Sequence, residues 1–301
     1  MPLKQIKNKI IATKKTGQVT KAMESVSAVK MRKSQERAFL GRPYIHSALK
    51  ILAKLAKSSR NLKHPLLSTK SEGRTLLVIV TSDKGLAGSL NGAVLRKAEK
   101  TFKLYKDTDV IAVGKKAVEF ALREKKTILS SYTNISDGVK VDDVYDLASK
   151  VVEAYKTENY RSVMVIYQNF ISTFEQEPLV RQVLPLEVKE VKQMMEGIRP
   201  RIGKFSNSLG DIDEVAIPYT IEPDIEAVLN TLLPQLVQVL FYHALLENKA
   251  SEHSARMVAM KNATDKSKEV VKSLTTKFNK ARQAQITAEV SEIMAGVEAM
   301  K

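Results

Sequence analysis

The chain has 301 residues, with 49 Lys and Arg against 33 Asp and Glu, and 44% of its residues are apolar. This length and apolar fraction are sufficient for a packed core, so disorder of the whole chain is excluded. The absence of Cys excludes disulfides, thiolate zinc sites and thiol redox control. No run of about 18 consecutive apolar residues predicts a membrane span, and the first residues lack the apolar run and cleavage site of a signal peptide.

The net charge of +16 is concentrated at the start of the chain. Residues 1–60 hold fifteen Lys and Arg but only two acidic residues, Glu24 and Glu36, whereas the rest of the chain is nearly neutral. A basic arm of this kind predicts an acidic partner, which could be phosphate, an anionic lipid or an acidic protein surface. A helix whose charges are simply solvated is the alternative interpretation.

Residues 3–58 are predicted to form one long helix or two helices in series, bent near Gly41 and Pro43. The helical spacing of apolar residues supports this prediction. These residues are Leu3, Ile6, Ile10, Val19, Met23, Val26, Ile45, Leu49, Leu52 and Leu55. Residues 61–73 are expected to be a connection.

Residues 74–221 are predicted to form an α/β domain, because short apolar runs alternate with helical patterns. Strands are expected at 75–81, 109–113 and 127–132, and helices at 89–105, 115–125 and 141–156. This alternation is typical of βαβ units with a mostly parallel, Rossmann-like sheet. The extended runs 162–173 and 177–191 predict a hairpin at the sheet edge, followed by a loop at 192–214 and a last strand at 216–221.

Residues 222–301 are predicted to form one long helix with a coiled-coil seam. From Ile225 to Phe278, seam positions alternate in steps of three and four, as in a left-handed coiled coil. Pro234 is expected to kink this helix. After Phe278 the apolar stripe slips to Ile286 and continues to Met300, which predicts an apolar tip enclosed by other subunits.

The length of the C-terminal helix restricts the architecture. Over residues 223–300 it would extend about 115 Å, whereas a compact globule of this chain length is roughly 50 Å across. The seam therefore needs a partner helix, and the basic segment 1–60 is the other long helix. We expect an antiparallel two-helix coiled coil of the chain ends, with the α/β domain inserted between them.

No motif in the sequence predicts catalysis, a cofactor site or a metal site. The loop at residues 81–91 follows a strand and opens a helix, but it lacks the spacing of a P-loop and of G-x-G-x-x-G, so it is predicted to be a tight β–α turn. The histidines at 46, 64, 243 and 253 lack the i,i+4 spacing of metal ligands, and His243 and His253 are expected to be polar seam residues.

Four segments of the chain resemble the gamma subunit of F-type ATP synthases. They are KNKIIATKKTGQVTKAMESVSAVKMRKSQ at 7–35, SDKGLAGSLN at 82–91, ARMVAMKNAT at 255–264 and NKARQAQITAEVSEI at 279–293. The resemblance is strongest at both ends and weak over residues 95–215. Ala87 stands where many relatives have Cys, and the regulatory Cys pair of the chloroplast form is absent.

The resemblance implies a non-catalytic rotor shaft that couples ion-driven rotation to ATP synthesis. It would turn in single copy within a ring of three alpha and three beta subunits, with its α/β domain beside epsilon and the membrane ion-carrying ring. It would not insert into the membrane itself, and its place would be the cytoplasmic face of the bacterial inner membrane. Rotation of an asymmetric shaft would change the nucleotide affinity of each catalytic site in turn.

The resemblance also implies which residues contact the catalytic ring. Lys21, Met23, Lys84 and Arg256 would lie near acidic loops of the catalytic subunits. Arg282, Gln283 and Thr287 would meet the ring higher up, and the apolar tip would turn in a sleeve of apolar side chains.

Two other classes of protein remain alternatives. A coiled-coil protein that binds nucleic acid would use the same basic arm on phosphates, although its basic residues are not interleaved with the aromatics that favour single-strand binding. A nucleotide-dependent enzyme built on the middle domain is the second alternative.

Overall fold

The computed structural model describes residues 2–40, 47, 48, 51, 64–157, 159–187, 222 and 224–300. Two long helices, α1 (Leu3–Leu40) and α7 (Ile225–Glu298), come from the two ends of the chain. Met1–Ser27 and Met257–Lys301 form one compact unit, here the coiled-coil unit, and Ala28–Arg256 forms the other, here the α/β unit. The division between these units falls within both helices, whereas the prediction assigns each long helix whole to its own segment, 1–60 and 222–301, on either side of 74–221. Residues 41–46, 49, 50 and 52–63 of the predicted N-terminal helical segment and its connection lie outside the described residues.

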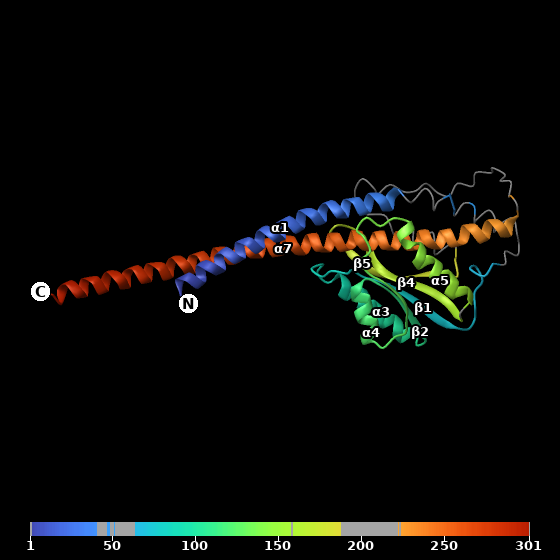
Figure 1. Cartoon of the computed structure of the whole chain (residues 1–301), viewed down its shortest axis with the longest axis horizontal. Coiled ribbons are helices and arrows are strands. Elements are labelled where there is room, and N and C mark those ends of the chain that lie inside the picture. The colour runs from blue at the N-terminus through green and yellow to red at the C-terminus, as the bar shows by residue number, and fades with distance from the viewer. Residues whose placement is uncertain are drawn as a thin grey trace. The chain divides into compact units, whose positions relative to one another are not determined.

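In the coiled-coil unit the two helices are antiparallel, as predicted (Figure 1). The Ser267 hydroxyl donates a hydrogen bond to the Thr13 carbonyl at 2.8 Å, and the hydroxyls of Thr20 and Thr264 are hydrogen-bonded at 2.7 Å. Residues later in α1 therefore pair with residues earlier in α7, as they do in an antiparallel pair of helices.

The seam of the coiled-coil unit consists of buried and half-buried residues in steps of three and four. They are Leu3, Ile6, Ile10, Thr13, Gly17 and Thr20 on α1, and Met260, Thr264, Ser267, Val271, Leu274 and Phe278 on α7. The α7 positions are those predicted. On α1 the helix is confirmed over Leu3–Leu40, but Val19 and Val26 of its apolar pattern lie outside the seam, because they are 59% and 52% exposed. Small and hydroxyl residues take their place in the seam, and an apolar pattern cannot detect these.

Gly17 allows close approach of the two helices, because a Cβ at this position would lie 2.6 Å from the Ser267 Oγ. Gly17→Leu is therefore expected to force the helices apart and to destabilise the chain by about 1–3 kcal/mol. Thermal unfolding followed by circular dichroism would measure this loss. In Gly17→Ala/Ser267→Ala the added Cβ no longer meets the hydroxyl, so most of the stability should remain. An unchanged unfolding temperature for Gly17→Leu would contradict the seam at this turn.

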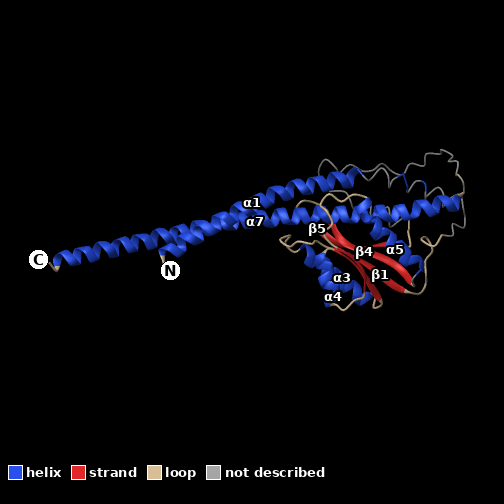
Figure 2. Cartoon of the chain, viewed as in Figure 1, coloured by secondary structure: helices blue, strands red, loops and turns tan. Residues whose placement is uncertain are grey.

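The α/β unit is built on a five-stranded sheet of order β3-β2-β1-β4-β5. Figure 2 shows strands of this sheet in red and the helices beside it in blue. The strands are β1 (Arg74–Val80), β2 (Thr108–Val113), β3 (Ile128–Tyr132), β4 (Tyr160–Phe170) and β5 (Gln176–Leu184). The first four are parallel, and β5 pairs with β4 as an antiparallel edge hairpin. The predicted parallel sheet and hairpin are therefore confirmed; the predicted loop at 192–214 and strand at 216–221 lie outside the described residues.

Helices cover both faces of the sheet, which gives the Rossmann-like arrangement that was predicted. Helices α3 (Leu90–Leu104) and α4 (Lys115–Arg123) pack on one face, while α5 (Tyr145–Thr157) and α7 pack on the other. A 3-10 turn, Asp142–Val144, precedes α5. Strand β1 serves both cores because its side chains alternate: Leu77 and Ile79 face α3 and α4, and Leu76 and Val78 face α5 and α7.

Helix α7 continues through Pro234 and forms part of the core of the α/β unit. Its residues Leu233, Leu236, Leu240, Phe241 and Leu245 are all at most 3% exposed. An 18-residue window of this helix has a mean hydropathy of 1.3, so by length and composition it could cross a membrane. Of that window 39% is buried within the chain, and the residues named above pack in the core beside the sheet.

Candidate functional site

The carboxyl end of the sheet is where Rossmann-like folds bind nucleotides, at the point where the strand order reverses. Here that point lies between β1 and β4. The amides at the start of α4 are already used, since Asp83 Oδ1 accepts a hydrogen bond from the Lys115 N–H at 3.1 Å and Thr81 Oγ1 accepts one from Ala117 at 2.9 Å. These donors are thus occupied by the chain's own side chains rather than open to a phosphate.

The loop between β1 and α3, residues 82–89, is held in a defined conformation at this edge. The Asn91 side chain accepts a hydrogen bond from the Ser82 amide at 3.0 Å and donates one to the Ser82 hydroxyl at 2.7 Å. Lys84 is exposed at the turn, and Leu86 is 63% exposed with a positive φ of 63°. The loop therefore presents a cation and an apolar side chain to solvent.

Arg256 of α7 holds this loop through a hydrogen bond to its backbone. Its Nη2 donates to the Gly85 carbonyl at 3.3 Å and to Glu252 Oε1 at 2.7 Å, and the residue is only 9% exposed. The sequence predicts Arg256 and Lys84 as separate contact residues, and the structure brings them to the same loop. Of the two, Lys84 is the exposed one and Arg256 is engaged within the chain.

Arg256 belongs to a cluster of buried charges along one face of α7. Lys249 Nζ lies 3.8 Å from Glu252 Oε2 and 3.6 Å from Asp137 Oδ1, and His253 Nε2 lies 3.3 Å from Asp137 Oδ1. Burial lowers the pKa of His253, an effect that Asp137 and Glu252 partly oppose and that Arg256 and Lys249 reinforce. Burial raises the pKa of Asp137, but the hydrogen bond from Lys30 and the charges of His253, Lys249 and Lys30 lower it overall.

The lowered pKa of His253 predicts a pH dependence of stability. A histidine that binds its proton less readily in the folded chain stabilises the fold above its unfolded pKa of about 6.5, and this contribution is lost as the pH falls through the folded pKa. We expect urea unfolding to show decreasing stability between pH 7.5 and 5, with a shallower slope in His253→Gln. Some slope should remain, because burial also lowers the pKa of His64. Equal slopes in the variant and the parent chain would contradict the prediction.

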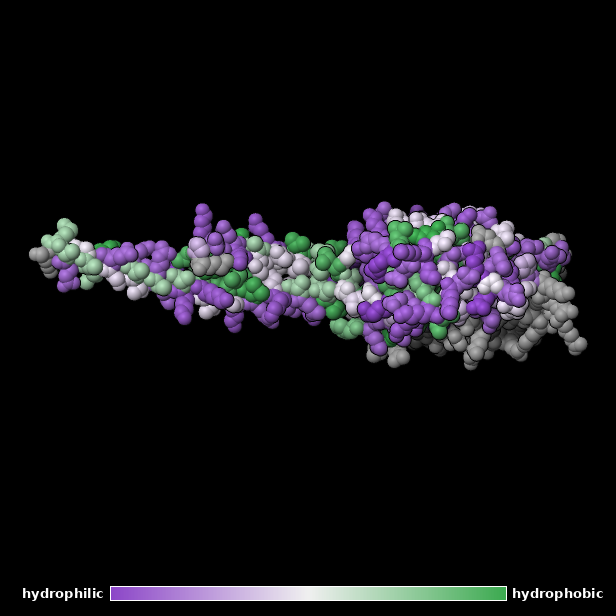
Figure 3. Space-filling view, turned by 90° about the horizontal axis from the view of Figure 1, so that it is seen from below, coloured by the Kyte–Doolittle hydropathy of each residue, from purple (hydrophilic) through white to green (hydrophobic). Residues whose placement is uncertain are grey.

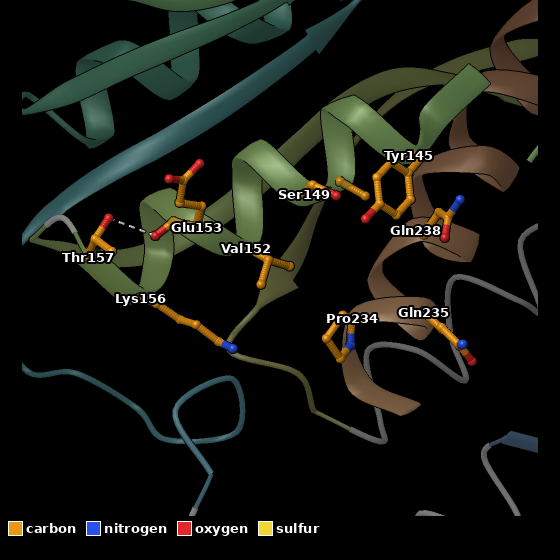
Figure 4. Close-up of a pocket in the computed structure, with 10 residues that line it drawn as sticks. Tyr145, Ser149, Val152, Glu153, Lys156, Thr157, Pro234, Gln235 and Gln238 are labelled. Carbon is orange, nitrogen blue, oxygen red and sulfur yellow. Dashed lines mark hydrogen bonds between the residues drawn. The ribbon is translucent and has the colours of Figure 1, made fainter. Parts of the chain in front are cut away.

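A pocket of about 380 Å³ lies between α5 and α7, away from this loop (Figure 4). Tyr145 and Val152 point into it from α5, opposite Pro234 of α7. The titratable residues in its described lining are Tyr145, Glu153 and Lys156, which do not make a nucleophile–base pair of the kind that hydrolases use. We find no reactive chemistry in this pocket.

The surface of the coiled-coil unit is strongly basic on both helices. Residues 1–27 contain six Lys and one acidic residue, and residues 261–282 contain seven Lys and Arg against two acidic residues. The predicted contact residue Lys21 is exposed and pairs with Glu24 at 3.0 Å, while Met23 is half-buried. The sequence analysis missed the second basic segment, residues 261–282, because acidic residues elsewhere after residue 60 nearly cancel its charge in the net charge of that part of the chain.

The last turns of α7 differ from the basic segment in exposing apolar side chains. Arg282, Gln283 and Thr287 are exposed, as their predicted contacts require. From Ile286 onward the exposed large apolar residues are Ile286, Val290, Ile293, Met294, Val297 and Met300. In Figure 3 purple, hydrophilic side chains project along the coiled coil, and pale green side chains gather at the C-terminal end of α7.

Comparison with known proteins accounts for this combination of a coiled coil and an α/β unit. The family model described as ATP synthase matches residues 2–300. The ATP synthase gamma chain of Heliobacterium modesticaldum is 37% identical over 298 residues, which is 99% of both chains, and that of Pelotomaculum thermopropionicum is 35% identical over 300 residues, again 99% of both. The chain belongs to the ATP synthase gamma-chain family.

Solved structures show the same fold. The central stalk of the Tetrahymena thermophila mitochondrial ATP synthase matches with a TM-score of 0.59 and 26% identity, over 81% of this chain and 99% of that one. A chain of the Euglena gracilis mitochondrial enzyme matches with a TM-score of 0.66 over 99% of this chain and 94% of that one, at 20% identity. Membership in the gamma-chain family confirms the predicted function: a stalk subunit that is not itself catalytic, within a membrane-bound synthase. The nucleic-acid alternative has no support.

Proposed function

We propose that this chain is the single-copy rotor shaft of a bacterial F-type ATP synthase, on the cytoplasmic face of the inner membrane. Its coiled-coil unit turns within a ring of three alpha and three beta subunits, and its α/β unit contacts epsilon and the ion-carrying ring. The observation that carries this proposal is the surface of the coiled-coil unit. Residues 1–27 and 261–282 form a basic zone, and along α7 this zone is followed by an exposed apolar end.

The basic zone suits acidic loops of the catalytic subunits. On α1, the apolar residues Ile11, Val19 and Val26 are exposed on the side opposite the seam, among exposed lysines. A surface that mixes cations with apolar side chains matches a partner loop that carries both carboxylates and apolar residues. Lys21 and Met23 belong to this zone, and Lys84 presents a further cation from the α/β unit.

The exposed end of α7 suits a contact that allows rotation rather than one that holds a single orientation. Arg282, Gln283 and Thr287 begin this end, and their polar side chains would make contacts that form and break as the shaft turns. The apolar residues that follow would lie in a sleeve of apolar side chains, where contact is non-directional and does not hold one orientation.

Purification of the tagged chain from its own membranes tests the proposal. We expect it to emerge with ATP-hydrolysing subunits, and native mass spectrometry should show one copy per complex. A chain that purifies alone, or in several copies per complex, would overturn the proposal.

Arg282→Glu tests the contact zone within the assembled enzyme. It reverses an exposed charge and should lower ion-driven ATP synthesis while the isolated chain unfolds at the same temperature. Lys100→Glu, an equal reversal at an exposed position of α3, is the matched control. Equal rates for the two variants would exclude Arg282 as a coupling contact.

A further inference from the structure

Asp137, in the loop between β3 and α5, connects three parts of the α/β unit through one carboxylate. Its Oδ2 accepts a hydrogen bond from Lys30 Nζ of α1 at 2.6 Å. Its Oδ1 faces α7, where it lies 3.3 Å from His253 Nε2 and 3.6 Å from Lys249 Nζ. One oxygen is thus directed to each helix. We call this arrangement the Asp137 bridge.

The loop that carries Asp137 also contacts both helices, α1 and α7, through its backbone. Lys249 Nζ also donates to the Ile135 carbonyl at 3.0 Å, which ties the start of the loop to α7. A Cβ on Gly138 would lie 3.2 Å from Arg37 Nη1, so the backbone after Asp137 is close to a second α1 cation, seven residues after Lys30. Two successive heptad positions of α1 therefore face this loop.

The charges explain why an acidic residue is needed here. The cations Lys30 and Lys249 approach Asp137 from two helices, and Arg256 lies further along α7. His253 also approaches Asp137, but its lowered pKa favours the neutral form. Without the carboxylate, cations on α1 and α7 would face each other without a counter-ion from the loop, and like charges at such separations repel. The apolar contact of Met31 with Phe170 and Ala250 gives this part of α1 packing, but packing alone has little directional preference.

We propose that Asp137 is a positioning residue for energy coupling, which locks residues 28–40 of α1 and residues 249–253 of α7 to the sheet so that the three turn as one body. The inference rests on the proposed function, because only a rotating shaft needs its α/β unit and both helices to resist slipping. Asp137 touches no substrate, and it acts by holding the helices in register with the edge strand β3.

Hydrogen exchange on the isolated full chain tests the fastening directly. In Asp137→Asn, amides of residues 28–40 should exchange about three- to tenfold faster, while those of the central strands β1 and β4 are unchanged. Glu119→Gln is the matched control, since it neutralises an exposed carboxylate that pairs with Lys116 at 2.7 Å within α4 alone. Unchanged exchange over residues 28–40 would overturn the proposal and leave the proposed function intact.

Rescue in the assembled synthase tests the coupling role. Because the chain has no Cys, Lys30→Cys/Asp137→Cys can be joined by a short bifunctional thiol reagent before assembly. The unjoined double variant should lose ion-driven ATP synthesis by about threefold or more, and joining the two residues should restore it. Normal synthesis in the unjoined variant, or no recovery on joining, would overturn the coupling role. A failure of the proposed function would instead appear as a parent chain that does not assemble.

Discussion

Glu252→Ala is expected to lower the free energy of unfolding by about 3 kcal/mol, as removal of one partner from a buried ion pair does. Glu252 is 4% exposed, its Oε1 lies 2.7 Å from Arg256 Nη2 and its Oε2 lies 3.8 Å from Lys249 Nζ. The substitution leaves two buried cations without the carboxylate between them. Urea unfolding followed by circular dichroism would measure the loss.

Glu269→Ala is the control for this prediction. Glu269 pairs with Lys266 on the same helix at 2.7 Å, but the two side chains are 67% and 74% exposed. Solvent screens such a pair, so the change should stay within about 0.5 kcal/mol. If the two variants lost similar amounts, burial would not be the reason that the Glu252–Arg256 pair matters.

The Glu252–Arg256 pair limits how Arg256 can be tested for a role in coupling. Arg256→Glu would place a second carboxylate beside Glu252 and release the Gly85 carbonyl, so lost synthesis would report damage to the fold as well as a lost contact. Arg282 has no such internal partner among the described residues, and its charge reversal tests contact with the ring alone.

Phe241→Ala is expected to destabilise the chain by about 3–5 kcal/mol, because truncation of a fully buried aromatic leaves a cavity. Phe241 is 1% exposed in the core formed by α5, α7 and the sheet. The same helix contains a window apolar enough to cross a membrane. A large loss, measured by urea unfolding of the chain in water, would show that its apolar side chains serve the core of the α/β unit.

Val290→Ala on the same helix provides the comparison. Val290 is 53% exposed in the last turns of α7, so the substitution removes little buried surface and should change stability by less than about 0.5 kcal/mol. A small loss for Phe241→Ala, close to that for Val290→Ala, would contradict the packing of α7 on the sheet.

Local periodicity in the sequence was sufficient for the helices and strands of the described residues and for the parallel sheet with its edge hairpin, but it did not predict the order of the strands. The parallel strands were predictable because burial on both faces makes them short apolar runs, as at Leu76–Val80 in β1. The seam of α7 from Met260 to Phe278 was predictable because its spacing repeats over many turns. The proposal that the exposed residues Arg282, Gln283 and Thr287 contact the ring came from resemblance alone.

Tertiary structure decided the features that depend on residues far apart in the chain. Thr13, Gly17 and Thr20 form the α1 seam in place of Val19 and Val26, because two closely packed helices favour small side chains that can share hydrogen bonds over larger apolar ones. Asp137 gains its role only when folding brings residues 30, 137 and 249 together. The sequence by itself therefore determined the two long helices, the basic arm and the α/β core, since these follow from local patterns. Which polar groups meet inside the fold depended on long-range geometry, on which local spacing carries no information.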